Sequence, residues 1–591
     1  MINPITRLTN KIEALASAVS LATPVRKSCA LLLLVTGLWC LVLIQGVDVT
    51  SVMEARNLRT AEEIVENDAW LLPTLNGELR ILKPPLPTWT VALMAKLSGD
   101  TRNLFLLRLP SLAVALLLAW FIFLLVSDCY GRRAALLSVL ALVTNIQMIG
   151  EIQTARWDLF VCTFATGMLW AMTRAYRLPG QAGRYSLLAI ILGIASYLSK
   201  GPVGILFVAL PYFLALWLWN YLEPKPTAEA TASNLDRESL RQATPRTWRQ
   251  AGWFTIVIAA SLFLGNAWWL LVWFHYPDTW RLLMQDVAGV NSGSHTEAIY
   301  AYLLMAPPLM APWTLLFLSA VACWFMDCRQ WWRQWRAQRT AGNSATNPAA
   351  SHRLFPGIWF VVGLILLSFT PAKKNRYFLL LWPSLAVFMG IFLEQLISDS
   401  SLLAKRRWLQ WVINLQVWAV AAVTIVMPIG LGVLAYYGAA ATIWAFAPLF
   451  LVLGWALFRR TANAAQAIVA TSLAVVATTT VIFLYFPQTR WYPTGYEEAN
   501  RIKAIAGTTK LYLVGGDSPK LLWAMSKSYH KLQPEHLPAQ PWPAFFLVDG
   551  PSQAACAQQL QQAQLKRELV YRFSTYEHRR TESWYLYRVS R

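Results

Sequence analysis

Residues 48–87, DVTSVMEARNLRTAEEIVENDAWLLPTLNGELRILKPPLP, form a polar stretch between two long apolar segments. Within it, Glu54–Asn67 has apolar residues on one side at helical spacing, which predicts a helix too short and too charged to span a membrane. The LNGE sequence at 75–78 predicts a turn. Lys83-Pro84-Pro85 then rigidifies the start of a second amphipathic segment, Leu86–Leu97. The stretch therefore predicts a structured loop at one face of a membrane.

The composition is that of a polytopic membrane protein. Of the 591 residues, 56% are hydrophobic and only 14% are charged, and the mean hydropathy is +0.41. A soluble domain usually has about 25% charged residues. The formal net charge is +21, but Lys and Arg lie in short clusters between apolar runs. This pattern indicates membrane topology and argues against a nucleic-acid partner.

The seven cysteines include no CxxC pair, and most lie in or beside apolar segments. We therefore expect neither a disulfide framework nor a thiolate metal site. The first apolar run is long enough to span a membrane and is followed by no A-x-A site, so we expect no cleavable signal peptide.

About thirteen stretches are long and apolar enough to span a membrane, which takes about 20 residues each. The segment 185–200 is the shortest of them, and a short break between 436 and 441 divides two others. The predicted spans are 28–47, 104–127, 132–150, 156–174, 185–200, 202–221, 253–274, 302–327, 354–371, 376–396, 409–436, 441–458 and 464–486.

Basic residues cluster in every second connection between these spans, as the positive-inside rule requires of cytoplasmic loops. The alternation places the N-terminus inside and the C-terminal tail outside. The cytoplasmic clusters include Arg132 and Arg133, Arg174 and Arg177, Arg333 and Arg336, and Lys405 to Arg407.

From about residue 490 the composition changes to that of a soluble domain. Buried strands alternate with helices there, which predicts a small α/β domain outside the membrane that caps or supports the site. We thus expect an α-helical polytopic membrane domain, residues 1–487, with an outer loop 48–103, followed by an α/β domain, residues 488–591. The expected strands and helices are 510–515, 518–528, 544–548 and 551–564, with two further strands after them.

Carboxylates at the membrane boundary are the first candidates for chemistry. Asp48 and Glu54 lie just beyond the first predicted span, where a carboxylate can act as a general base or metal ligand. Glu62, Glu63 and Glu66 are expected only to solvate the loop helix. Asp158 lies just inside the fourth span, and an ionisable residue at membrane depth is a functional candidate. The alternative for Asp158 is a structural pairing with Arg156 or with a cation of a neighbouring helix.

Several cations lie on the predicted outer face, against the positive-inside trend. Lys83 is in the first loop, Lys200 is in an SKGP turn at 199–202, and a PAKKNRY turn follows at 371–377. Cations at headgroup level suit a phosphate or pyrophosphate, with binding of anionic lipid as the alternative. The candidates in the last turn are Lys373, Lys374, Arg376 and Tyr377.

The outer loop 275–301 contains His295, which is a candidate metal ligand or phosphate contact. A solvated loop histidine is the alternative. A divalent metal ion is the one cofactor for which we find a candidate ligand.

Taken together, these motifs resemble those of the bacterial GT-C enzymes related to the lipid A aminoarabinose transferase and to protein O-mannosyltransferases. The resemblance covers about 40–400. It rests on the order and placement of short matches: EAR at 54–56, WLLPTLNG at 70–77, KPPL at 83–86, RLPS at 108–111, TARWD at 154–158, SKGP at 199–202, APW at 311–313 and SFTPAKKNRYFLLLWPSLAVF at 368–388.

The resemblance implies a sugar donor linked to a polyprenyl phosphate and a reaction at the periplasmic face of the bacterial inner membrane. It implies a first-loop carboxylate as the base or acceptor-orienting group, and cations, Arg56 among them, for the carrier phosphate. Two positions depart from the family pattern. Met53 stands where the family often has Asp, and Leu82 stands where an acidic residue often precedes Lys83.

We therefore predict a glycosyltransferase that moves a sugar from a polyprenyl-phosphate carrier to a lipid, glycan or protein acceptor. The absence of a Rossmann fingerprint suits a lipid-linked donor better than a nucleotide sugar. The rival prediction is a transporter or flippase, which would show interrupted spans in two similar halves with polar residues at mid-membrane. The polar residues of this chain instead gather at one face, and a non-catalytic scaffold would leave the outer cations unexplained.

Overall fold

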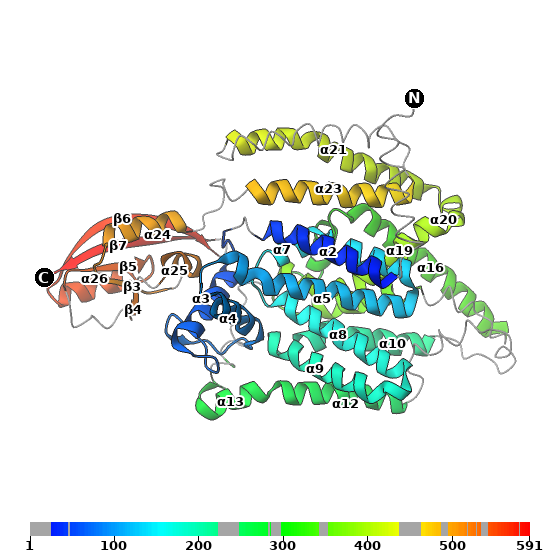
Figure 1. The fold of residues 1–591 in the computed structure, drawn as a ribbon, viewed down its shortest axis with the longest axis horizontal. Helices are drawn as coiled ribbons and strands as arrows, with labels where there is room; N and C mark the ends of the chain where they lie inside the picture. Colours follow the sequence, from blue (N-terminus) through cyan, green and yellow to red (C-terminus); the bar gives the residue numbers. More distant parts are fainter. Residues whose placement is uncertain are drawn as a thin grey trace.

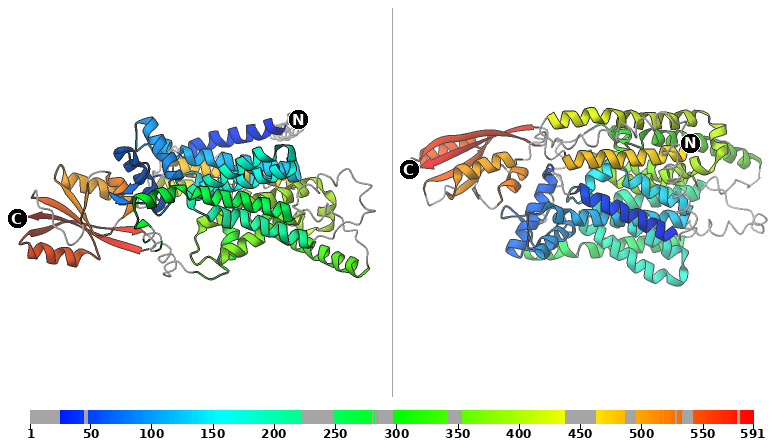
Figure 2. Two further views of the ribbon diagram at one scale, coloured as in Figure 1. Left: turned by 90° about the horizontal axis from the view of Figure 1, so that it is seen from below. Right: turned by 45° about the horizontal axis from the view of Figure 1, so that its top comes forward.

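Long helices lie side by side in a bundle, the first loop covers one end of it, and a sheet domain lies beyond that loop (Figures 1 and 2). The computed structural model describes residues 25–44, 48–222, 248–279, 281, 284, 297–341, 353–436, 463–485, 495–516, 518–526, 529–532, 542–577 and 580–591.

The predicted apolar segments within the described residues form helices, and the predicted span 441–458 lies outside those residues. The bundle helices are α2 (Val25–Leu43), α5 (Leu104–Tyr130), α6 (Arg132–Val143), α7 (Ile146–Ile152), α8 (Asp158–Arg177), α9 (Ala182–Lys200), α10 (Leu210–Leu222), α12 (Trp248–Gly265), α13 (Ala267–His275), α15 (Ala301–Leu309), α16 (Thr314–Ala341), α18 (Phe355–Ser368), α19 (Trp382–Ser398), α20 (Ser400–Lys405), α21 (Trp408–Tyr436) and α23 (Ala464–Tyr485).

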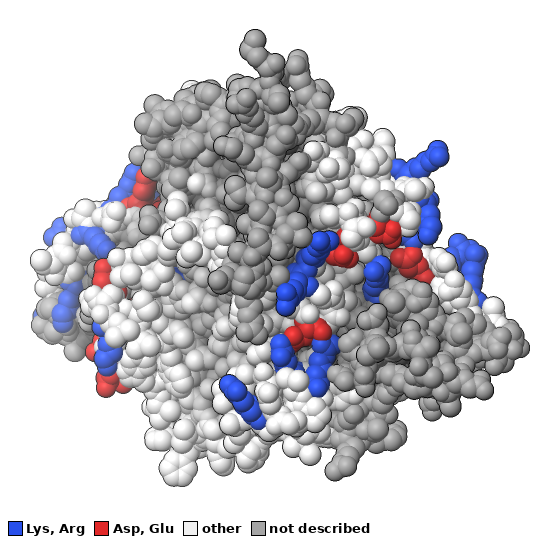
Figure 3. Space-filling view, turned by 45° about the vertical axis from the view of Figure 1, so that its right-hand side comes forward, with Lys and Arg blue, Asp and Glu red and all other residues white. Residues whose placement is uncertain are grey.

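Six helices in the described part of the chain are long and apolar enough to cross a membrane, or seven if a bent pair counts as one span. Three shorter apolar helices accompany them. Large apolar side chains such as Trp217, Phe263 and Leu303 are exposed on the flank. Figure 3 shows charged side chains gathered in patches that border a largely uncharged flank. The chain is therefore a multi-span membrane protein.

The bent pair consists of α6 and α7, which meet at 66° although the sequence predicts one continuous span. The bend occurs at Asn145. Its side-chain oxygen accepts hydrogen bonds from the backbone of Gln147 and Met148, and its amide donates to the carbonyls of Leu309 and Ala311. A buried Asn that caps a new helix and bonds a neighbouring segment replaces the backbone bonds lost at the break.

The first loop has the predicted order of elements: α3 (Val52–Asn67), a hairpin of β1 (Thr74–Leu75) and β2 (Glu78–Leu79), and α4 (Leu86–Ser98). Asn76 and Gly77 at the hairpin turn both have positive φ, 57° and 78°. An Asn-Gly pair adopts this conformation at low cost and matches the twist of the two strands.

The expectation that the glutamates of α3 only solvate the helix is wrong for Glu62 and Glu63, which are buried. Glu63 accepts hydrogen bonds from the Thr74 hydroxyl at 2.6 Å and the Asn76 backbone at 2.7 Å, so it fixes the hairpin turn. Glu62 pairs with Arg59 and Arg102. The helix is packed inside the loop, because its apolar side contacts α4 and the C-terminal domain.

The C-terminal domain is a mixed five-stranded sheet in the order β4-β3-β5-β7-β6 with helices beside it. β4, β3 and β5 are parallel, whereas β5, β7 and β6 are antiparallel. The predicted strands and helices are present; α24 and β4 were not predicted. The elements are α24 (Tyr496–Ala506), β3 (Leu511–Val514), α25 (Pro519–Met525), β4 (His530–Leu532), β5 (Ala544–Asp549), α26 (Gln553–Gln562), β6 (Lys566–Glu577) and β7 (Arg580–Ser590).

The C-terminal domain packs against the first loop, at the end of the bundle that this loop covers (Figure 1). Trp523 of α25 is 1% exposed and packs in one apolar cluster with α3 and α4. The Tyr529 hydroxyl donates to the Asn76 side chain at the hairpin turn. Lys531 pairs with Glu78 at 2.9 Å. The hairpin that leads to Lys83 is thus held by α3 on one side and by the C-terminal domain on the other.

Candidate active site

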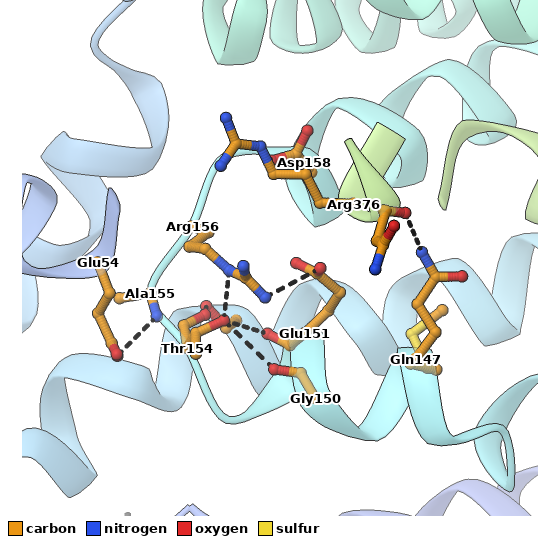
Figure 4. A network of polar contacts seen from close by, with 12 residues as sticks. Glu54, Gln147, Gly150, Glu151, Thr154, Ala155, Arg156, Asp158 and Arg376 are labelled. Carbon is orange, nitrogen blue, oxygen red and sulfur yellow. Dashed lines mark hydrogen bonds and ion pairs between the residues drawn. The ribbon is translucent and has the colours of Figure 1, made fainter. Parts of the chain in front are cut away.

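A buried ion pair joins the first loop to the bundle. The Glu54 carboxylate of α3 accepts from Arg108 of α5 at 2.8 and 3.2 Å, and both side chains are fully buried. The same carboxylate accepts from the Ala155 backbone at 3.0 Å, as Figure 4 shows. Both Glu54 oxygens are therefore occupied, and the residue fixes the connection between α7 and α8.

Two more hydrogen bonds hold the same connection, residues 153–157, and a third orients the Asn57 side chain. The Asn57 amide donates to the Ala155 carbonyl at 2.9 Å, and its oxygen accepts from Thr88 of α4 at 2.6 Å. The Ser111 hydroxyl of α5 donates to the Thr154 carbonyl at 2.9 Å. Buried polar groups with complete hydrogen bonds make a rigid support. The first loop, α5 and α4 together position the residue that follows, Asp158.

Asp158 begins α8, is 3% exposed, and joins two cations from distant parts of the chain. It pairs with Lys200 and lies 3.6 Å from the Arg376 Nε. Lys200 ends α9, because Gly201 there has a φ of +66° and Pro202 follows. An acidic residue in the first turn of a helix and a basic residue in the last turn both interact favourably with the helix dipole. Of the alternative pairings, the one with Arg156 is not seen, since Arg156 pairs with Glu151 at 2.9 Å. The one with a cation of a neighbouring helix is seen, because Lys200 belongs to α9, which packs against α8.

The two cations that pair with Asp158 interact with Tyr377, and their charges act on a further lysine of the same turn. The Lys200 Nζ lies 4.4 Å and the Arg376 Cζ 5.3 Å from the centre of the Tyr377 ring. Burial lowers the pKa of Lys374, and the nearby charges of Arg376, Lys200 and Lys83 lower it further. The charge of Lys83, from the first loop, therefore acts on Lys374 of the 371–377 turn. We name Lys83, Lys200, Lys374 and Arg376, with Tyr377, the cation cluster.

Lys373 does not join the cation cluster, although the sequence offers it as a phosphate ligand. Its side chain is 7% exposed, and the ammonium donates to the carbonyls of Thr370 at 3.0 Å and Glu297 at 3.2 Å. An ammonium bound in this way fixes the turn and presents Lys374 and Arg376. These contacts favour a positioning role for Lys373, and its role as a phosphate ligand stays a prediction.

Asp48 lies close enough to Arg108 for the guanidinium charge to act on it. Its side chain is exposed, and partial desolvation raises the pKa of Asp48 while the Arg108 guanidinium opposes the shift. Its charge also affects Tyr496 of the C-terminal domain. Among the predicted first-loop carboxylates, Asp48 is thus the accessible one, whereas Glu54 is enclosed.

The remaining predictions concern Arg56 and the metal ligand. Arg56 of α3 is half-buried and lies close to Arg80, whose pKa is lowered by burial and by this second guanidinium. His295 lies outside the described residues. No group of three or more His, Cys, Asp and Glu side chains that could hold a metal occurs among the described residues.

The sequence reasoning missed the roles of Arg108 and Asn57 and the contact of Arg80 with Trp157. Arg108 had a usable signal, because a lone arginine at the start of a long apolar segment needs a buried carboxylate. Asn57 and Arg80 had none, since each looks like an ordinary polar residue of a helix or a turn.

Three comparisons place this geometry among known proteins. Residues 82–228 match the family model described as dolichyl-phosphate-mannose-protein mannosyltransferase. The structure also matches that of ArnT from Cupriavidus metallidurans in the apo state, with a TM-score of 0.65, 15% identity, and coverage of 95% of this chain and 98% of that one. The chain has the fold of ArnT. The same protein bound to undecaprenyl phosphate matches with a TM-score of 0.61 and 16% identity, over 94% of this chain and 97% of that one.

A curated relative is the undecaprenyl phosphate-alpha-4-amino-4-deoxy-L-arabinose arabinosyl transferase of Pseudomonas aeruginosa, 24% identical over 398 residues. The matched part is 64% of this chain and 62% of that protein. An uncharacterized protein of Aquifex aeolicus is 21% identical over 338 residues, 57% of this chain and 58% of that one. The resemblance to GT-C lipid-linked-sugar glycosyltransferases is confirmed, and the Pseudomonas aeruginosa relative is a transferase by name.

Proposed function

We propose that this protein is a glycosyltransferase that moves a sugar from a polyprenyl-phosphate carrier to an acceptor at the periplasmic face of the bacterial inner membrane. The observation that carries the proposal is the cation cluster. It brings residues of the first loop, the end of α9 and the 371–377 turn to one end of an apolar bundle. Such a cluster binds a phosphate at headgroup level, while the apolar helices accept a prenyl chain.

The topology that we propose has thirteen spans, a cytoplasmic N-terminus and the domain of residues 488–591 in the periplasm. The alternating basic clusters of the sequence support this orientation. The first loop and the C-terminal domain lie at the same end of the bundle, which fits an odd number of spans after a cytoplasmic N-terminus. The relatives act on, or bind, undecaprenyl-phosphate compounds by name, which supports a donor of that class.

In the proposed reaction an acceptor nucleophile attacks the anomeric carbon, and the bond from that carbon to the carrier phosphate oxygen breaks. The electron pair leaves with the phosphate, whose new charge is stabilised by Lys83, Lys200, Lys374 and Arg376. Asp158 holds Lys200 and Arg376 in place before the carrier binds. We propose Asp48 as the base that takes the acceptor proton, because both oxygens of Glu54 are already bound.

The test is a transfer assay with the purified full-length protein in lipid nanodiscs. Radiolabelled polyprenyl-phosphate sugars of several classes are supplied with membrane lipid, glycan and protein acceptors. We expect transfer of at least one sugar, lowered about 10²-fold or more in Lys200→Gln, because charge stabilisation of a leaving group is a large catalytic term. Lys96→Gln removes an exposed first-loop cation as the matched control. Failure of every sugar, or equal rates in Lys200→Gln and the control, would overturn the proposal.

A further inference from the structure

Glu151 of α7 has one carboxylate oxygen without a partner among the residues that the structure describes. The side chain is 4% exposed, and its Oε1 accepts from Arg156 at 2.9 Å. Its Oε2 is buried and accepts no hydrogen bond from the described residues. A buried carboxylate oxygen without a donor is costly, and in native proteins such atoms are satisfied by a neighbour, a water or a ligand. The reaction proposed above gives Glu151 no role.

Helix α7 presents Glu151 to the turn that carries the cations. Gln147 lies one helical turn before Glu151, so the two side chains share a face of α7. The Gln147 amide donates to the Asn375 carbonyl at 2.9 Å, and its oxygen accepts from the Trp382 indole at 2.9 Å. This face of α7 therefore packs against the 371–377 turn, and Figure 4 shows the bond from Gln147.

The Glu151 carboxylate thus lies beside the proposed phosphate site without belonging to it. Arg376 belongs to the same turn, and its Nε lies 3.6 Å from Asp158. Asp158 comes two residues after Arg156, the partner of Glu151. Figure 4 shows Glu151, Arg156, Asp158 and Arg376 on the side of the 153–157 connection that faces away from Glu54.

Charge and hydrogen-bonding capacity decide which group fits the second Glu151 oxygen. A carboxylate only accepts hydrogen bonds, so its partner must be an O–H or N–H group. Arg156 already balances the charge of Glu151, so a neutral donor is sufficient, whereas a phosphate would be repelled. A sugar hydroxyl has the required chemistry. In a polyprenyl-phosphate sugar the sugar is bonded directly to the phosphate, so its hydroxyl groups lie next to the residues that hold that phosphate.

We propose that the Glu151 Oε2 accepts a hydrogen bond from a hydroxyl group of the transferred sugar, which makes Glu151 a specificity-determining residue for the donor. The assignment rests on the proposed function, because that function places the carrier phosphate at the cation cluster. The acceptor binds elsewhere, since its proposed base, Asp48, belongs to the segment that leads into α3, on the Glu54 side of the connection.

Binding without transfer tests this assignment, so its failure and the failure of the proposed function are distinguishable. The full-length protein in nanodiscs is titrated, with no acceptor present, with a short-chain polyprenyl phosphate and with its glucose, mannose and arabinose conjugates. Each conjugate is compared with its monodeoxy analogues, and the deoxy ratio is the Kd of the analogue divided by the Kd of the parent. We expect a deoxy ratio of about 10 or more for at least one hydroxyl in the wild type, because hydrogen bonds to charged acceptors are strong.

The same ratio should fall below about 3 in Glu151→Gln, because no charged acceptor remains for the hydroxyl. A merely structural defect would weaken the binding of parent and analogue alike and leave the ratio unchanged. The double variant Glu151→Met/Arg156→Met removes both charges of the pair, so it avoids a stranded guanidinium if the single variant does not fold. Its deoxy ratio should also fall below about 3.

Asp128→Asn is the matched control, because Asp128 also pairs with an arginine, Arg174, but at the other end of α8. This variant should keep the deoxy ratio of the wild type. Lys200→Gln should weaken binding of the bare carrier and of its conjugates alike; unchanged carrier binding there would contradict the proposed function, not the role of Glu151. No hydroxyl with a deoxy ratio of about 10 in the wild type, or a ratio unchanged in both Glu151 variants, overturns the assignment.

Discussion

Replacing Glu54 with alanine tests whether this carboxylate is an anchor of the site or its base. Glu54 and Arg108 are fully buried, and the Ala155 backbone N–H donates to the same carboxylate at 3.0 Å. The substitution leaves a buried guanidinium without its counter-charge. Breaking a buried ion pair in this way costs about 3–5 kcal/mol. We expect Glu54→Ala to lower the free energy of unfolding by that amount.

Equilibrium unfolding in mixed detergent micelles measures the loss, and a second substitution separates its causes. The double variant Glu54→Ala/Arg108→Leu removes the stranded charge, so we expect it to recover about 2 kcal/mol or more of the loss. Lys96→Ala breaks an exposed ion pair of the same loop, and as the matched control it should cost no more than about 1 kcal/mol.

Two results would refute this reasoning. One is a Glu54→Ala protein as stable as the wild type, or a double variant no more stable than the single one. The other is a Glu54→Gln protein that folds with normal stability but loses about 10²-fold or more of its transfer rate, as expected for loss of a general base. The second result would return the role of base from Asp48 to Glu54.

Three further predictions concern the base, the cation cluster and the C-terminal domain. The pKa of Asp48 is raised and a base acts deprotonated, so kcat/KM should fall as the pH drops through that raised value. Asp48→Asn should remove this acidic limb of the pH profile and lower the rate about 10²-fold. A variant with an unchanged pH profile would exclude Asp48 as the base. The pKa of Lys374 is lowered, so this lysine should lose its proton, and polyprenyl-phosphate binding should weaken, at a lower pH than for a free lysine. Thermal shift from pH 7 to 10 measures the binding, and Lys374→Arg should abolish the weakening. Trp523→Ala should cost about 3–5 kcal/mol and lower carrier affinity, since the first loop loses a packing partner; equal affinity at normal stability would show that the domain does not support the loop.

The sequence was sufficient where local chemistry decides the structure. The apolar runs predicted the helices because a spanning helix must be long and apolar. The first loop was predictable because α3 and α4 are amphipathic and Asn76-Gly77 has the conformation that its hairpin needs. Asp158 was a candidate because an ionisable residue at membrane depth is costly. Lys200 and Arg376 were candidates because they are cations on the predicted outer face, against the positive-inside trend.

The sequence was insufficient to predict the role of a residue where that role depends on a partner far away in the chain. Lys373 and Lys374 are adjacent in one turn, and only the fold shows that Lys373 bonds carbonyls while Lys374 is surrounded by other cations. Glu63 looks like a solvated helix residue until the hairpin folds back and donates to it. The bend between α6 and α7 is equally hidden, because both sides of Asn145 are apolar and its partners lie more than 160 residues away.

The two departures from the family pattern now have a physical consequence. Met53 and Leu82 replace expected acidic residues, and Leu82 is 37% exposed, so neither supplies a carboxylate beside the cations. Arg80, two residues before Leu82, adds a further cation instead. The described site therefore has more positive charge than one carrier phosphate neutralises, and Asp158 is the carboxylate paired within the cation cluster. A departing phosphate is stable as an anion, so such a site accelerates transfer chiefly by stabilising that charge. Removal of a cation of the cluster should for this reason cost at least as much activity as removal of the proposed base, Asp48.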